Sequence, residues 1–120
     1  MAKRRLDHAS VRISSLERSR DFYEGLLRFT PAPRPEMGIP GVWYQLGKGQ
    51  LHLIQCDQPA AEGIDPTQPH FAVEVEDLGT TRRELRDAGV DMLDFGGEQL
   101  WVRDPDGNTV ELRAPAATRK

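Results

Sequence analysis

The 120-residue sequence contains one pattern written twice, and this internal repeat restricts the chain to a small set of folds. Each copy begins with a short run in which apolar and polar residues alternate. A helical pattern follows, and then extended segments joined by turns. His8 opens the first copy and His70 the second, while His52 and Glu111 occupy matching places near the two ends. The order of these patterns predicts an α+β protein made of two β-α-β-β-β modules.

The boundaries of the modules follow from the turn-forming residues. We expect a first module over about 5–56, a linker rich in Pro and Gly over about 57–69, and a second module over about 70–114, all within a single domain. The expected elements are strands at 6–13 and 70–76, helices at 16–28 and 78–88, a weak strand among the prolines at 31–35, a short strand near 90–95, and hairpins turning at 47–49 and 104–108. The acidic residues of the 104–108 turn occupy positions that turns favour, so we interpret them as structural.

Residue types that commonly bind metals share one face in the four matching runs. Side chains of a strand alternate between its two faces, so the face of each residue follows from its position in the run. His8, His52, His70 and Glu111 all point away from the apolar stripe of their own run. Independent placement would produce this agreement roughly one time in sixteen. The pattern favours a shared role for the four side chains.

Composition excludes several classes of function. The net charge of −3 provides no basic surface for nucleic acid, and no apolar run approaches the ~20 residues of a membrane span. No signal-peptide pattern is present, and the single cysteine, Cys56, excludes an internal disulfide. We therefore expect a cytoplasmic protein whose partners are small molecules, with no binding to nucleic acid or membrane.

Four segments of the sequence resemble a known family: Leu6-Asp7-His8, Phe22-Tyr23, the 102–108 segment and the 110–112 segment. They are similar to the vicinal oxygen chelate superfamily, which includes glyoxalase I, bleomycin-resistance proteins, fosfomycin-modifying enzymes, methylmalonyl-CoA epimerase and extradiol dioxygenases. The resemblance implies an eight-stranded half-open barrel around a central cavity, with the helices on the outside. It also implies a homodimer.

The same resemblance implies a divalent metal ion in the cavity, held by the first and last strands of each module. Carried over to this chain, the ligands are His8, His52, His70 and Glu111. Imidazole and carboxylate ligands suit Zn, Ni, Co, Fe or Mn without selecting one of them. Glyoxalase I usually has a glutamate where His52 stands, so Glu111 or His52 is the expected catalytic base.

Further side chains share the faces of these ligands and are expected to bind the substrate. They are Trp43, Gln45, Arg12, Trp101 and Arg103. Aromatic walls with a few polar groups are typical of small-molecule sites, and arginine binds anionic groups or pairs with carboxylates.

Two classes of function remain open from the sequence. In the first, the protein is a metal-dependent enzyme on a small substrate with vicinal oxygens, and glyoxalase I-like isomerisation is the best match. His8, His70 and Glu111 alone also resemble the ligand sets of extradiol dioxygenases and of fosfomycin-modifying enzymes. In the second class, the protein is a metal-free binder of a drug or metabolite, of the bleomycin-resistance type.

Overall fold

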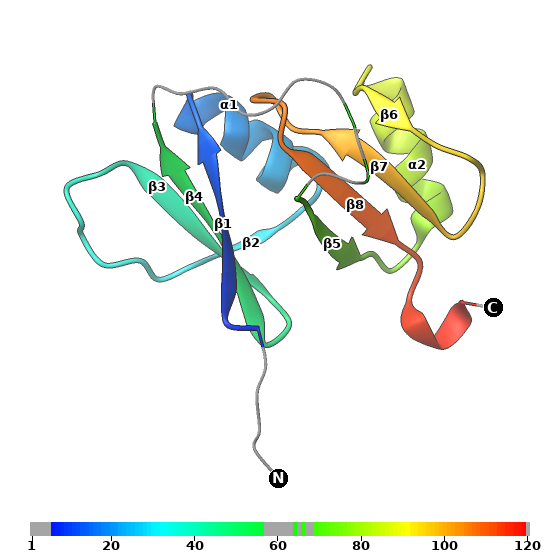
Figure 1. Cartoon of the computed structure of the whole chain (residues 1–120), viewed down its shortest axis with the longest axis horizontal. Helices are drawn as coiled ribbons and strands as arrows, with labels where there is room; N and C mark the ends of the chain where they lie inside the picture. The colour runs from blue at the N-terminus through cyan, green and yellow to red at the C-terminus, as the bar shows by residue number, and fades with distance from the viewer. Residues whose placement is uncertain (1–5, 57–63, 65, 67–68, 120) are drawn as a thin grey trace, which may run out of the picture. The chain divides into compact units, whose positions relative to one another are not determined.

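The computed structural model describes residues 6–56, 64, 66 and 69–119, and it divides into two compact units, Met1–Pro59 and Ala60–Lys120 (Figure 1). Each unit contains one β-α-β-β-β module and one four-stranded sheet. The α+β class and the two modules are therefore confirmed. Most of the expected linker at 57–69 lies outside the described residues, and the organisation as a single domain stays a prediction.

The first unit has six elements. They are β1 (His8–Ile13), α1 (Leu16–Arg20), the π-helix η1 (Asp21–Leu26), β2 (Thr30–Ala32), β3 (Gly41–Leu46) and β4 (Gly49–Gln55). The strand order is β1-β4-β3-β2, with β1 parallel to β4 and the other pairs antiparallel. The β3–β4 hairpin turns through Gly47, whose φ of 61° lies in the left-handed region that glycine adopts without strain.

The first helix differs from the expected uninterrupted helix over 16–28. It begins as predicted, because the side chain of Ser15 caps it by accepting a hydrogen bond from the Arg18 amide at 3.3 Å. It then continues as the π-helix η1 and ends at Leu26. Arg28 follows with a φ of 61°, a left-handed conformation that stops a helix.

The core of the first unit lies on the apolar face of its sheet. Tyr44 of β3 is fully buried, and its ring lies 5.9 Å from that of Tyr23 and 5.7 Å from that of Phe29. Its hydroxyl donates a hydrogen bond to Glu24 at 2.9 Å, so this buried polar group is satisfied. Leu51 and Leu53 of β4 complete the same buried layer. The helix therefore packs on the face opposite to the predicted ligands.

The second unit repeats this arrangement. Its elements are β5 (Phe71–Glu74), α2 (Leu78–Asp87), β6 (Met92–Leu93), β7 (Gln99–Arg103), β8 (Thr109–Arg113) and the short 3₁₀-helix η2 (Ala116–Thr118). The strand order β5-β8-β7-β6 matches that of the first sheet, and β5 is again parallel to β8. Asp77 caps α2 by accepting from the Thr80 amide at 3.1 Å. The strand expected over 70–76 is shorter in the structure, where β5 covers Phe71–Glu74 and His70 lies one residue before it.

Apolar side chains of β7 and β8 form one layer of the second unit. Leu100, Val102, Val110 and Leu112 are fully buried, as the alternation of these strands predicts. The turn at 104–108 is structural, as expected: Asp104 is buried and accepts hydrogen bonds from the backbone amides two and four residues later. Among the described residues, no helix is long and apolar enough to cross a membrane.

Candidate metal-binding and substrate-binding site

The polar face of the first sheet carries three stacked rings. His52 of β4 lies between His8 of β1 and Trp43 of β3, with ring centroids 4.1 Å apart on both sides and interplanar angles of 11° and 3°. The stack follows from the register, because Ser10 and Trp43 are the cross-strand partners of His52 and His8 is two residues before Ser10. The register thus brings together three of the five residues of this unit that parity assigned to the site.

A chain of hydrogen bonds determines which nitrogen of His52 carries its proton. The amide nitrogen of Gln45 donates to the backbone carbonyls of Gly47 and Gly49, at 2.9 and 3.3 Å. The amide nitrogen of Gln50 donates to Oε1 of Gln45 at 2.8 Å, and this orientation presents Oε1 of Gln50 to Nε2 of His52, also at 2.8 Å. An amide oxygen can only accept, so Nε2 is protonated and Nδ1 of neutral His52 keeps its lone pair.

His8 has the opposite tautomer. Its Nδ1 lies 2.8 Å from Oδ2 of Asp7, and a carboxylate only accepts, so Nδ1 carries a proton and Nε2 is the nitrogen that keeps the lone pair in the neutral form of the ring. A carboxylate on the outer nitrogen is the usual support of a metal-binding histidine, because it orients the ring and raises its basicity. His8 and His52 therefore each offer one nitrogen that could bind a metal ion.

The surroundings of His52 favour its neutral form. Burial lowers the pKa of His52, since only 8% of the residue is exposed, and the nearby His8 and Arg34 lower this pKa further against an opposing contribution from Asp7. Neutral imidazole is the form that binds metals or accepts a proton. At pH 7 the ring is thus available for both roles.

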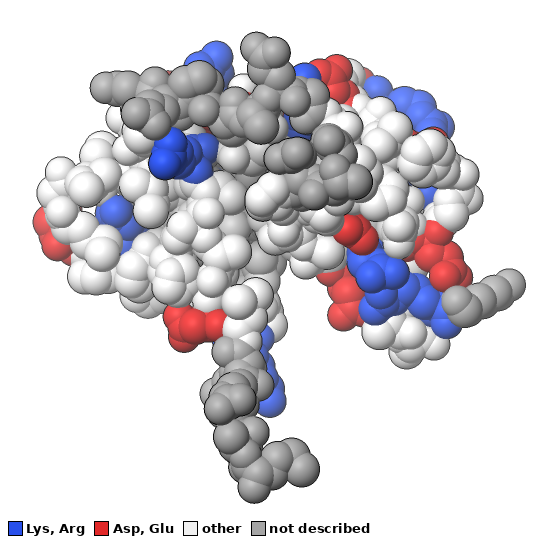
Figure 2. All heavy atoms as spheres, viewed as in Figure 1, with Lys and Arg blue, Asp and Glu red and all other residues white. Residues whose placement is uncertain are grey.

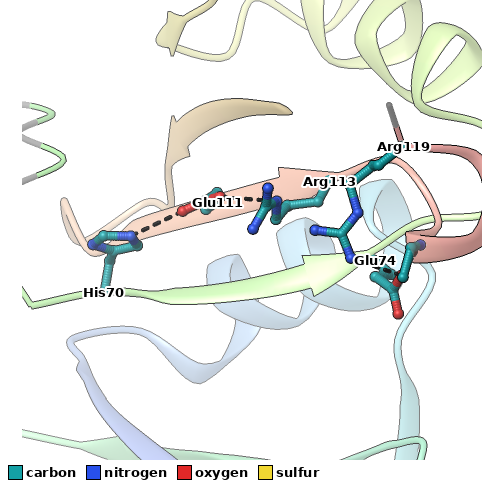
Figure 3. A network of polar contacts seen from close by, with 6 residues as sticks. His70, Glu74, Glu111, Arg113 and Arg119 are labelled. Atoms are coloured by element: carbon teal, nitrogen blue, oxygen red, sulfur yellow. Dashed lines mark hydrogen bonds and ion pairs between the residues drawn. The ribbon is translucent and has the colours of Figure 1, made fainter. Parts of the chain in front are cut away.

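The second sheet brings together the other two predicted ligands (Figure 3). Nε2 of His70 lies 3.0 Å from Oε1 of Glu111, and Nε of Arg113 lies 3.4 Å from Oε2 of the same carboxylate. Only 8% of Glu111 is exposed. The buried carboxylate is therefore oriented by a hydrogen bond to His70 on one side and an ion pair with Arg113 on the other.

A second ion pair fastens the end of the chain to the same sheet. Glu74 of β5 accepts from the backbone amide of Ala116 and forms an ion pair with Arg119 at 3.3 Å (Figure 3). Sequence patterns did not predict the helix η2, in which Ala116 lies. Its position depends on a carboxylate more than forty residues away, and local patterns do not contain such a contact.

The other residues predicted to bind substrate differ in their contacts and in their exposure to solvent. Trp101 is the cross-strand partner of Glu111, and its ring meets that of Phe95 edge-on at 6.2 Å. Arg103 lies 3.8 Å from an Asp91 carboxylate, and Arg12 is exposed on the same face of β1 as His8. Gln45 is engaged in the hydrogen-bond chain described above. On the face drawn in Figure 2, positive and negative side chains are interspersed with uncharged ones.

The structure thus presents the candidate ligands as two pairs, His8 with His52 in the first unit and His70 with Glu111 in the second. Over the described ranges, no three His, Cys, Asp or Glu side chains form a group that could hold a metal ion. Convergence of the two pairs on one ion stays a prediction. Sequence reasoning did not include Arg34, because it lies in a proline-rich passage where no strand parity applies.

Comparisons with known proteins identify the family. The family model for the Glyoxalase/Bleomycin resistance protein/Dioxygenase superfamily matches residues 5–112. The chain belongs to this superfamily. The resemblance inferred from the sequence motifs is therefore confirmed.

Three relatives illustrate the range of the superfamily. Glyoxylase I 4 of Arabidopsis thaliana is 32% identical over an alignment of 120 positions, which covers 89% of this chain and 68% of that protein. Mitochondrial methylmalonyl-CoA epimerase of Bos taurus is 28% identical over 74% of this chain and 57% of its own length. The solved structure of the trypanothione-dependent glyoxalase I of Leishmania major is 26% identical, with a TM-score of 0.73 over 93% of this chain and 87% of that one.

Proposed function

We propose that this superfamily member is a metal-dependent enzyme that isomerises a small substrate with vicinal oxygens by a glyoxalase I-like reaction. The observation that carries the proposal is the repetition of a ligand-type pair at equivalent places of the two modules. His8 and His52 belong to the parallel strands β1 and β4, while His70 and Glu111 belong to the entry of β5 and to β8, which are the equivalent parallel pair. Duplicated pairs of this kind suit one ion bound by both modules.

The donor set fits a borderline divalent ion. Three imidazoles and one carboxylate suit Zn, Ni, Co, Fe or Mn. Two observations on the first unit support ligation: His52 is neutral at pH 7, and both His8 and His52 keep one nitrogen lone pair free of the hydrogen bonds that orient the rings. When bound, the ion would polarise the two substrate oxygens and stabilise the negative charge that develops on them.

Glu111 is our first candidate for the catalytic base. Its carboxylate is buried and is held between His70 and Arg113, so it reaches a substrate in a defined orientation. In an isomerisation, a carboxylate oxygen removes a proton from one substrate carbon and returns it to the neighbouring carbon, so no proton is consumed. His52, with its free Nδ1, is the second candidate for this role.

Trp43 and Trp101 are proposed as aromatic walls for the substrate, because each is the cross-strand partner of a candidate ligand. Arg12, Arg103 and Gln45 are proposed as polar contacts. The relatives support a reaction of this kind, since two of those named above are glyoxalases and the third is an epimerase.

The direct test of the function combines metal analysis with an activity assay. We expect protein purified without added metal to contain or take up one divalent ion per chain and to isomerise a hemithioacetal. We expect a chelator to abolish turnover and added ion to restore it. A protein that binds no divalent ion and turns over neither hemithioacetals nor catechols would instead support the metal-free binding function.

A homodimer is the expected assembly. Both sheets are open, and natural proteins seldom leave sheet edges free. Several large apolar side chains are also exposed, as is typical of surfaces that meet a partner: Leu6, Met37, Ile39, Ile54 and Phe95. Light scattering at micromolar concentration should therefore give twice the chain mass of 13.5 kDa. A stable species at the chain mass would contradict the dimer.

A further inference from the structure

Arg34 carries a positive charge that no acidic side chain in the described part of the structure neutralises. It lies in the loop between β2 and β3 and is half-buried. Its Nη2 donates to the backbone carbonyl of Ile39 at 2.7 Å, whereas its buried Nε has no hydrogen-bond partner there. A half-buried guanidinium with an unsatisfied nitrogen lowers the stability of the folded protein, so its presence here calls for a physical reason.

The guanidinium of Arg34 lies beside the start of strand β3. Gly41 is the first residue of β3 and lies two residues before Trp43, a member of the ring stack. A Cβ built on Gly41 would lie 3.0 Å from Nη2 of Arg34. The charge of Arg34 also reaches His52, because it contributes to lowering the pKa of that ring. The cation thus lies beside the strand that carries Trp43, and its charge acts on His52 of the proposed site.

The loop itself holds this cation in place, since no acidic side chain within 6–56 or 69–119 pairs with it. Pro33 and Pro35 flank Arg34, and a following proline restricts the backbone of the residue before it to extended conformations. The carbonyl of Ile39 then orients the guanidinium. A role limited to bracing the loop explains this one hydrogen bond, but it does not explain why a half-buried charge has no counter-ion among the residues that the structure describes. An arginine that is oriented by a backbone carbonyl is instead suited to bind an anion that arrives from solution.

We propose that Arg34 binds an oxyanion of the substrate, either a carboxylate or a phosphate. The substrate class is then a small molecule that carries an oxyanion beside its vicinal oxygens. The statement that the oxyanion belongs to the substrate rests on the proposed function. Binding of an anion by Arg34 does not depend on that function, because it requires no metal ion. Arg34 would determine specificity, because an uncharged analogue gives the half-buried guanidinium no anionic partner.

Nuclear magnetic resonance on the ¹⁵N-labelled full chain, freed of metal, tests this proposal. The Nε–Hε signal of Arg34 is followed while inorganic phosphate is added to one sample and pyruvate to another. We expect a saturable shift with at least one of the two anions. The anion that binds more tightly then identifies the phosphate or the carboxylate as the preferred group.

Three variants separate binding from folding. Arg34→Gln should weaken binding of that anion at least about tenfold, which corresponds to ~1.4 kcal/mol, since a charged hydrogen-bonding partner is lost. Arg34→Lys keeps the charge without the planar fork and should give an intermediate affinity. Arg18→Gln is the matched control, because it removes an exposed arginine of helix α1 and should leave the affinity unchanged. Thermal unfolding of each variant verifies the fold.

Absence of a saturable shift with both anions, or equal affinity in Arg34→Gln and the parent chain, would overturn the proposal. Failure of the metal-dependent function has a different signature. In that case the metal-free protein still binds the anion through Arg34, but a divalent ion neither binds nor restores turnover.

Discussion

Replacing Glu111 by Gln is expected to lower isomerase turnover by about 10²-fold or more without unfolding the protein. The amide keeps the shape of the side chain and one oxygen that can accept from His70, which lies 3.0 Å from Oε1 in the parent. It loses the negative charge that faces Arg113, and it cannot accept a proton. General-base catalysis typically contributes about 10²- to 10⁴-fold, which sets the size of the expected loss.

Steady-state kinetics with a hemithioacetal, at saturating metal, measures this effect. Glu74→Gln is the matched control, because it removes a carboxylate from the same sheet, where Glu74 pairs with Arg119. We expect the control to retain turnover and the thermal unfolding of both variants to remain cooperative. Full turnover by Glu111→Gln would remove Glu111 from the mechanism and leave His52 as the base.

The second large effect is expected on metal affinity. If both ligand pairs bind one ion, His8→Ala and His70→Ala should each lower the affinity at least about 100-fold. Changes to residues that only support metal ligands already cost 10- to 100-fold, and loss of a ligand costs at least as much. Each variant removes a ligand from a different unit, so equal sensitivity to both changes is the signature of a shared ion.

Calorimetric titration of metal-free protein with Zn²⁺ measures affinity and stoichiometry together. Ser10→Ala is the control, because Ser10 lies on the polar face of β1 between His8 and Arg12 and is not a candidate ligand. A variant His8→Ala with unchanged affinity, or two independent ions per parent chain, would show that the pairs do not share a site. The histidine pair of the first unit would then need another role.

Strand parity accounts for most of what could be predicted about the site. The faces of His8, His52, Trp43 and Glu111 were predictable because alternation is a local property of an extended backbone. The helix η1 was not predictable in the same way. Its π geometry accompanies the burial of Tyr23 against Tyr44, a residue of a distant strand. Helical spacing in the sequence contains no information about such a contact.

The position of the Arg34 side chain could not be predicted from sequence patterns. Its flanking prolines predict an irregular passage, and no periodicity assigns its side chain to a face. Only the folded loop places its guanidinium against Gly41 and near His52. A charged residue between prolines is a weak signal in a sequence, and it becomes informative only when its surroundings among the described residues are known.

The sequence by itself determined the two β-α-β-β-β modules, the polar face of each sheet and membership of the superfamily. These properties follow from alternation, helical spacing and turn residues, which act over a few neighbouring positions. Tertiary structure alone decided which partner each site residue meets. His52 is stacked between two rings and holds its proton on Nε2 because β1, β3 and β4 pair in one register. That register joins residues far apart in the chain, and so it depends on the packing of the whole sheet.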